Sequence, residues 1–327
     1  MKRLTIEDAV GKMNEYAKRN IPYIFIINYD RTEAIVEPLS EVNPKEMLYC
    51  FQQENNIPYS LAGDHSPISW NFLPPDRQLY HSKFSTVVNN EKAGNSYLTN
   101  LTCRIPVSTN LSLQQIFLRS KARYRLWIKD ELVCFSPEIF IRVKGSSISS
   151  YPMKGTIDAS RPHAAEELMN DNKEAAEHAT IVDLIRNDLS MVAEQVHVPR
   201  YRYIEELSTN RGSILQTSSE IQGQLLPYYR EHPGDLLLRQ LPAGSITGAP
   251  KPKTVAIIRE AEDYDRGYYT GVMGIWNEGN IDSAVMIRFI DQQDGQLYYK
   301  AGGGITARSD EEKEYNEIIE KIYVPVC

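Results

Sequence analysis

The sequence predicts an α+β protein whose strands pair mainly in antiparallel hairpins. A helical pattern over about residues 5–19 is followed by the apolar run PYIFIINY and by a second strand near EAIVEPL, which makes a small α+β opening. Further along, the strand-like runs YRLWIKD, ELVCFSPEIF and IFIRVKG follow one another with short polar turns between them. This spacing favours hairpins over a βαβ series. At 327 residues, 42% of them apolar, the chain can bury one large core or two moderate ones.

The density of periodic apolar residues changes along the chain. Residues 53–100 mix Asn, Ser, Pro and Gly with few periodic apolar positions, and we expect long loops there. If the chain has a domain boundary, it lies in that stretch. We expect a single domain over residues 1–327, in which 1–105 form a short N-terminal α+β portion and 106–327 form the core that carries the motifs.

The rest of the chain is rich in predicted helices and strands. Helices are expected around SLQQIFLRSKAR, from about Asp171 to Ala193, near 233–241 and 251–263, and over the closing segment DEEKEYNEIIEKIYV. In the longest of them, apolar residues recur at helical spacing: Ala175, Ala179, Val182, Ile185 and Leu189. Further strands are expected near SILQTSSEIQGQL, YTGVMGIWN, SAVMIRFI and QLYYKAG.

Charge and cysteine content argue against several classes of protein. The net charge of -7 leaves no basic patch for nucleic acid, so a small molecule or a protein is the expected partner. The cysteines are far apart and without zinc-like spacing, and we expect reduced structural thiols at Cys50, Cys103, Cys134 and Cys327. No segment resembles a signal peptide or approaches the roughly 18 apolar residues of a membrane span. These features predict a cytoplasmic protein that does not enter the membrane.

Two predicted helices each carry a Glu-x-x-Glu pair, Glu174 with Glu177 and Glu314 with Glu317. At this spacing both carboxylates of a pair lie on one helix face, where they repel unless water screens them or a cation lies between them. Each pair alone is most simply a solvated face. The first pair, however, runs into the apolar stretch ATIVDLI, where a buried glutamate would need a partner. Two such helices facing each other would suit Mg²⁺, which prefers oxygen ligands.

Two glycine-containing stretches have a structural and a functional interpretation. AGGGITA, residues 301–307, is either a simple turn or a place where backbone N–H groups converge on an anion. AGSITGAPK lacks the order of a P-loop, and its Ser245, Thr247 and Gly248 either cap a helix or donate to a carboxylate. The residues alone leave both alternatives open.

Three charged side chains are equally ambiguous. Arg288 in VMIRFI either faces solvent or offers a planar fork to a carboxylate. Glu138 in FSPEIF is either a hairpin turn residue or a functional carboxyl. Lys154 in YPMKGTID is either an ordinary surface charge or an amine held for chemistry.

Taken together and in order, seven stretches resemble the chorismate-utilising enzymes, a family that includes anthranilate synthase component I, aminodeoxychorismate synthase component I, isochorismate synthase and salicylate synthase. The stretches are SPEIF, PMKGT, AAEHATIVDLIRNDLSMVA, GSITGAPK, GVMGIWN, IRFI and AGGGITARSDEEKEYNEIIEKI. The resemblance covers roughly residues 110–325. It implies a two-sheet β-sandwich wrapped by helices, with chorismate and magnesium in a deep cleft.

The resemblance also implies roles for the residues above. Glu177 and Glu317 are expected to ligate Mg²⁺, with Glu174 and Glu314 close by, and the ion would act as a Lewis acid when the C4 hydroxyl of chorismate departs. The groups expected to hold the substrate's carboxylates are Arg288, the backbone of Gly302, Gly303 and Gly304, Thr156, Thr247 and Lys321.

Lys154 separates the members of this family. The corresponding motif typically reads P-I-A-G-T in anthranilate and isochorismate synthases and P-I-K-G-T in aminodeoxychorismate synthases, and here it reads PMKGT. The resemblance therefore implies that Lys154 attacks ring C2 while Glu138, as general acid, protonates the leaving C4 hydroxyl. Attack requires the pKa of lysine, near 10.4 when free, to be lowered. If the lysine and the glutamate neutralise each other instead, neither is poised for this chemistry.

The implied function is that of the chorismate-aminating subunit of aminodeoxychorismate synthase, which makes 4-amino-4-deoxychorismate for the p-aminobenzoate moiety of folate. We find no glutaminase signature, so ammonia is expected from a separate glutamine amidotransferase subunit. The alternatives are another enzyme of the family, such as anthranilate or isochorismate synthase, or a chorismate-binding subunit without activity. Gln216 stands where anthranilate synthases have a histidine, which argues against a complete anthranilate reaction.

Overall fold

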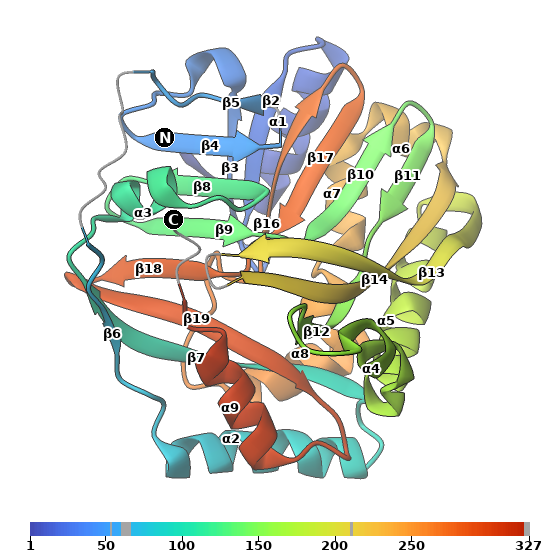
Figure 1. Ribbon diagram of the computed structural model, residues 1–327. Coiled ribbons are helices and arrows are strands. Elements are labelled where there is room, and N and C mark those ends of the chain that lie inside the picture. Colours follow the sequence, from blue (N-terminus) through green and yellow to red (C-terminus); the bar gives the residue numbers. More distant parts are fainter. Residues whose placement is uncertain (53, 60–66, 210–211, 324–327) are drawn as a thin grey trace.

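The computed structural model describes residues 1–52, 54–59, 67–209 and 212–323. Within these residues the strands form two mixed-length antiparallel sheets, and helices cover their outer faces (Figure 1). The two-sheet α+β fold predicted from the family resemblance is therefore confirmed. None of the described helices has the length and apolar character needed to cross a membrane.

The first sheet contains strands from both the N-terminal and the C-terminal parts of the chain. In spatial order it contains β1 (Arg3–Thr5), β3 (Glu33–Pro38), β2 (Tyr23–Ile27), β16 (Val272–Asn277), β17 (Asn280–Val285), β10 (Ile139–Lys144), β11 (Ser147–Ser150), β14 (Gly212–Leu225) and β12 (Met153–Asp158), with β13 (Ala193–Thr209) also paired to β14. Because β2 pairs with β16 in register over five residues, the N-terminal strands are continuous with the C-terminal part of the sheet.

The second sheet holds the remaining strands of the described residues. In spatial order it contains β15 (Gly248–Ala249), β7 (Leu98–Thr109), β19 (Gln296–Ile305), β18 (Phe289–Gln293), β9 (Leu132–Ser136), β8 (Tyr124–Ile128), β4 (Met47–Phe51) and β5 (Glu54–Asn55), with β6 (Trp70–Phe72) paired to β7. Its longest pairing joins β7 to β19. That pairing carries the three glycines.

The helices divide between the two outer faces. They are α1 (Ile6–Lys18), α2 (Arg77–Lys92), α3 (Leu113–Arg119), α4 (Ala164–Asn170), α5 (Asn172–Ser190), α6 (Pro227–Glu231), α7 (Pro233–Gln240), α8 (Lys251–Ala261) and α9 (Glu311–Glu320), with short 3₁₀ turns at Leu39–Glu41 and Gly244–Ile246. Figure 1 shows α4 and α5 beside β12 and β14, and α9 and α2 beside the second sheet.

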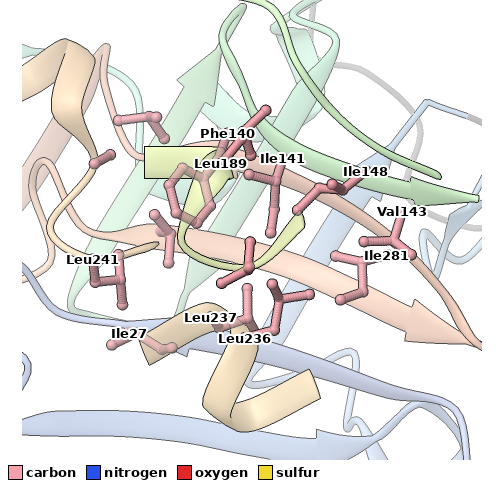
Figure 2. Close-up of a cluster of buried hydrophobic side chains, with 14 of the residues drawn as sticks. Ile27, Phe140, Ile141, Val143, Ile148, Leu189, Leu236, Leu237, Leu241 and Ile281 are labelled. Atoms are coloured by element: carbon pink, nitrogen blue, oxygen red, sulfur yellow. The ribbon is translucent and has the colours of Figure 1, made fainter. Parts of the chain in front are cut away.

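Among the described residues, three apolar clusters hold these layers together. One lies between the sheets and includes Ile24 and Met273 of the first sheet and Leu126 of the second. A second lies between the first sheet and helices α1, α5 and α7, where Leu189, Leu236 and Leu237 meet side chains of β10, β11 and β17 (Figure 2). The third lies under α2, α3, α8 and α9. Burial on both faces of each sheet explains why the strands are strongly apolar.

Aspartate caps set where the two acidic helices begin. The Asp171 side chain accepts a hydrogen bond from the backbone N–H of Glu174, and the Asp310 side chain accepts one from Lys313. An N-cap of this kind fixes the first turn and therefore the face on which later residues lie. The two caps therefore fix the helix face on which each Glu-x-x-Glu pair lies.

The structure contains one helix and one strand that the sequence did not predict. Residues 53–100 contain α2, a helix of 16 residues, where long loops were expected. Its apolar positions Tyr80, Phe84, Val87 and Val88 are buried at helical spacing, but intervening Asn and Ser residues mask this pattern. Helix α5 ends at Ser190, three residues before the predicted end at Ala193, and the 17-residue strand β13 that begins at Ala193 was not predicted.

Candidate active site

The chain crosses between the two sheets twice at the same place. Pro137 and Glu138 connect β9 of the second sheet to β10 of the first, and Met286 to Arg288 connect β17 of the first to β18 of the second. The crossings are hydrogen-bonded to each other, because Phe135 N–H donates to the Arg288 carbonyl at 3.0 Å and Val285 N–H donates to the Glu138 carbonyl at 3.2 Å. The predicted hairpin at Glu138 is therefore wrong: β9 and β10 do not pair.

A cavity of about 130 Å³ lies beside these crossings. It brings together side chains from both sheets and from the 3₁₀ turn before β15, and it is lined by Leu98, Asn100, Glu138, Met153, Lys154, Ile181, Ser245, Ile246, Gly248, Tyr269, Ile287, Arg288, Gly302, Gly303, Gly304 and Lys321. Two expected substrate contacts are not among the lining residues. Thr247 is fully buried, and Thr156 is exposed on β12.

Lys154 reaches the cavity from β12 and is held by a carboxylate. Its Nζ lies 2.6 Å from Glu177 Oε2, and it also lies against Gly304, where a Cβ atom would be 3.4 Å from the amine. Burial by itself lowers the pKa of Lys154, but the charges of Glu177, Glu174 and Glu317 and the hydrogen bond to Glu177 outweigh it and raise the pKa to about 12. In this state the lysine is an ammonium ion paired with Glu177, and not with Glu138.

The two Glu-x-x-Glu pairs meet across α5 and α9. Gly303 lies against the second pair, because a Cβ atom there would be 3.5 Å from Glu317 Oε1 and 3.6 Å from Glu314 Oε2. Glu177 and Glu314 are only 5% and 3% exposed. The solvated-face interpretation is therefore wrong for these two residues.

Two further lysines contact the same carboxylates. Lys173 Nζ lies 3.0 Å from Glu314 Oε1 and 3.7 Å from Glu177 Oε1, so it bridges α5 and α9. Lys321 Nζ lies 2.6 Å from Glu317 Oε1 and donates to the Gly302 carbonyl at 2.8 Å. Burial opposes ionisation of Glu317, yet Lys321, Lys154 and Lys173 together lower its pKa to about 2. The carboxylates are thus balanced largely by ammonium groups of the protein.

The donor set fits a hard divalent cation. Four carboxylates offer only oxygen ligands, and two buried oxygens, Glu174 Oε2 and Glu177 Oε1, accept no hydrogen bond from the described residues. In the described part of the chain, however, no three acidic, His or Cys side chains are gathered closely enough to chelate an ion as they stand. Binding would therefore require the carboxylates to exchange lysine partners for the ion.

The surroundings of Glu138 favour its neutral form, whereas those of Lys154 favour its charged form. It is 8% exposed, and burial raises the pKa of its carboxyl, although the hydrogen bond from Ser245 Oγ and the charges of Arg288 and Lys321 act in the other direction. A raised pKa favours the protonated acid, which is the form able to donate a proton. The GSITGAPK motif thus contributes Ser245 as the direct hydrogen-bond donor to Glu138.

Arg288 and the glycines form the remaining wall. Arg288 has a left-handed backbone with φ 55°, and its Nε donates to Tyr323 Oη at 3.4 Å. The glycines are not in a turn but in strand β19, paired with β7. The N–H and C=O groups of one residue point to the same side of an antiparallel strand, and the side alternates from residue to residue. The Gly302 carbonyl accepts a hydrogen bond from Lys321, so it points away from β7. Gly302 and Gly304, but not Gly303, therefore direct their N–H groups away from β7.

Sequence reasoning missed several residues of the site. Lys173 was not considered, although its position four residues before Glu177 is a signal for an ion pair on one helix face. Asn100, Met153 and Tyr269 line the cavity without any local sequence signal, because each reaches it from a different element.

Comparison with known proteins gives a consistent result. Residues 6–326 match the family model described as chorismate binding enzyme. The chain is 42% identical to an uncharacterized PabA-like protein of Pasteurella multocida over 99% of this chain and 100% of that protein, and 44% identical to an uncharacterized PabA-like protein of Haemophilus influenzae over 100% and 99%.

More distant relatives have named activities. Aminodeoxychorismate synthase component 1 of Escherichia coli is 33% identical over 75% of this chain, which spans 56% of that protein's length. Among solved structures, a putative isochorismate synthase of Bacillus anthracis superposes with a TM-score of 0.76 at 20% identity, covering 98% of this chain and 89% of that one. Anthranilate synthase component I of Streptococcus pneumoniae superposes with a TM-score of 0.68 at 27% identity, covering 81% and 61%.

Proposed function

Because the chain belongs to the family of chorismate binding enzymes, we propose that it aminates chorismate to 4-amino-4-deoxychorismate, as the chorismate-aminating subunit of an aminodeoxychorismate synthase. The observation that carries the proposal is Lys154, whose amine lines the same cavity as the buried carboxyl of Glu138. The similarity to the Escherichia coli synthase supports it. The product would serve formation of p-aminobenzoate for folate.

The cavity wall provides the binding groups. Chorismate carries two carboxylates, and the cations that line the cavity beside Lys154 are Arg288 and Lys321. Arg288 offers a planar donor fork, and the N–H groups of Gly302 and Gly304 add neutral donors on the β19 side. Thr156 and Thr247, which do not line the cavity, would act on the substrate only if the site rearranged on binding.

In the proposed reaction, the neutral amine of Lys154 adds to ring C2 while the bond from C4 to its hydroxyl breaks. Glu138 gives its proton to the leaving hydroxyl, which departs as water. Ammonia then adds at C4 and expels Lys154 from C2 as the free amine, and the proton that the added nitrogen releases returns to the Glu138 carboxylate. The high pKa of Lys154 in this state means that the amine must first lose the influence of Glu177. Burial, the largest single influence on that pKa, then favours the neutral form.

Glu177 and Glu317, with Glu174 and Glu314 beside them, would hold a magnesium ion, which would supply Lewis-acid assistance to departure of the C4 hydroxyl. If Glu177 became a ligand of this ion, Lys154 would be released from its ion pair with that carboxylate. Ammonia would come from a glutamine amidotransferase subunit, and the PabA-like names of the two relatives that match over their full length are compatible with such a partner.

The test is a product assay with chorismate, ammonium and Mg²⁺. The wild-type protein should form aminodeoxychorismate, and Lys154→Ala should reduce its rate of formation by at least ~100-fold, because the nucleophile is lost. Lys144→Ala is the matched control, since Lys144 is exposed at the end of β10 and should leave the rate unchanged.

The outcomes separate the alternatives. Anthranilate or isochorismate as the main wild-type product would replace the proposal with another reaction of the family. Tight binding of chorismate without any product would indicate a subunit that lacks activity. Unchanged output from Lys154→Ala would remove the nucleophile from the mechanism.

A further inference from the structure

The three lysines around the acidic helices are not equivalent. Lys154 and Lys321 are 20% and 24% exposed, whereas Lys173 is 47% exposed. Lys154 and Lys321 each approach one carboxylate oxygen at 2.6 Å. Lys173 makes longer contacts, 3.0 Å to Glu314 and 3.7 Å to Glu177, and the second of these exceeds hydrogen-bonding distance.

The position of Lys173 also differs. It is the second residue of α5, so its side chain extends from a helix end with access to solvent. Lys154 is anchored in β12 and lines the cavity, and Lys321 is tied to the Gly302 carbonyl. Of these three ammonium groups, Lys173 can move away with the least loss of contact.

We propose that Lys173 is a displaceable counter-ion: it holds Glu177 and Glu314 together when no divalent cation is bound, and it swings out to solvent when one binds. The proposal rests on the proposed function, because it takes the carboxylates of α5 and α9 as the ligands of that cation. It assigns Lys173 a role in setting the affinity of the site for the cation, and not a role in the chemical step.

Charge balance provides the physical reason. Fully ionised, the four carboxylates carry one more charge than the three lysines neutralise. While Lys154 still carries its proton, a divalent cation added without displacement would make the group positive and would place two cations against the same oxygens. Glu177 Oε1 is the oxygen best suited to change partner, because it is buried, accepts no hydrogen bond from any residue that the structure describes and faces Lys173 only at 3.7 Å. Withdrawal of one ammonium group therefore accompanies binding.

The test measures cation binding directly in the full-length protein. Mg²⁺ would be titrated by calorimetry and Mn²⁺ by electron paramagnetic resonance, for the wild type, Lys173→Met and Lys313→Met. Lys313 lies exposed on α9 next to Glu314, so its loss removes the same charge nearby without removing a contact to the carboxylates. Lys173→Met should bind the cation roughly three- to fivefold more tightly, the scale of one partly exposed ion pair, and Lys313→Met less than about twofold.

A second measurement does not depend on affinity. In metal-free buffer Lys173→Met should melt roughly 1–2 °C below the wild type, because Glu177 and Glu314 lose a shared partner. With saturating Mg²⁺ this difference should disappear, since the lysine is already displaced in the wild type.

The possible failures are distinguishable. Equal or weaker cation binding by Lys173→Met would overturn the role of Lys173 while leaving the proposed metal site in place. Equal gains in Lys173→Met and Lys313→Met would reduce the effect to general electrostatics and also overturn it. Failure of the wild type itself to bind either cation would refute the metal assignment of the proposed function and this inference with it.

Discussion

Two groups of buried charges lie on opposite sides of the cavity wall. They differ in how many of their charged atoms form hydrogen bonds. Behind the wall, Arg266 and Glu262 form a two-pronged ion pair with contacts of 2.6 and 2.8 Å. Arg266 also donates to the carbonyls of Ile246 and Asn100, both of which line the cavity. Glu262 additionally accepts two hydrogen bonds from Thr102.

The acidic helices in front of the wall are built differently. There, Glu174 Oε2 and Glu177 Oε1 are buried and form no hydrogen bond within the described part of the chain, and Lys173 is shared between two carboxylates. Charges whose bonds are all satisfied hold one geometry, because every rearrangement breaks a bond. Carboxylates that have an oxygen without a hydrogen bond, or that share one lysine, can exchange their partners. The comparison therefore distinguishes a group that positions the wall from a group that can accept a ligand.

The largest expected effect comes from breaking the satisfied pair. Arg266→Met leaves Glu262 buried without its partner and should lower the free energy of unfolding by about 3–5 kcal/mol. Urea denaturation followed by circular dichroism would measure it. Arg259→Met is the matched control, because Arg259 pairs with Asp30 while 66% exposed and should cost no more than about 1 kcal/mol. Similar losses in both variants would contradict the distinction between the two groups.

The sequence predicted the site better than it predicted how the sheets connect. Periodicity located α5 and α9, and one cavity is lined by residues that the ordered motifs had singled out, Glu138, Lys154, Arg288, Lys321 and the three glycines, whose roles stay predictions. The crossing at Glu138 was missed, because the sequence of a short connection does not show whether the two strands that it joins pair with each other. The crossing at Arg288 was missed because the apolar residues Met286 and Ile287 make SAVMIRFI resemble one continuous strand. The ion pair of Lys154 with Glu177 was missed for a related reason: it joins β12 to α5, and no local spacing encodes it.

A smaller effect tests whether the charged group on the acidic helices includes His178. His178 follows Glu177 on α5 but is fully buried and contacts Ser219 at 2.6 Å. Burial, with the nearby charges of Arg202 and Lys154, lowers its pKa from 6.5 to about 4. As pH falls through this range, the unfolded chain binds a proton that the folded protein does not. Stability attributable to His178 is therefore complete above about pH 6.5 and declines toward pH 4.

This pH dependence can be measured with a pair of variants. The wild type should lose about 2–3 kcal/mol of unfolding free energy through His178 between pH 6.5 and 4, from a pKa difference of this size. His178→Gln should lack that part of the decline. His197→Gln, at an exposed histidine, should keep it. An identical pH profile for all three proteins would show that His178 is not held neutral.

The smallest expected effect has the opposite sign and concerns Glu174. Burial raises the pKa of its carboxyl, Lys154 opposes this, and Glu177 adds to it. A carboxylate that is harder to ionise in the folded protein than in the unfolded chain destabilises the fold at neutral pH. In metal-free buffer Glu174→Gln should therefore raise the free energy of unfolding by about 0.5 kcal/mol, the scale of one like-charge pair on a helix face. Glu320→Gln, at an exposed position of α9, should have no such effect. A loss of stability in Glu174→Gln would mean that this carboxylate is satisfied in the same way as Glu262, and that the two sides of the wall do not differ at this residue.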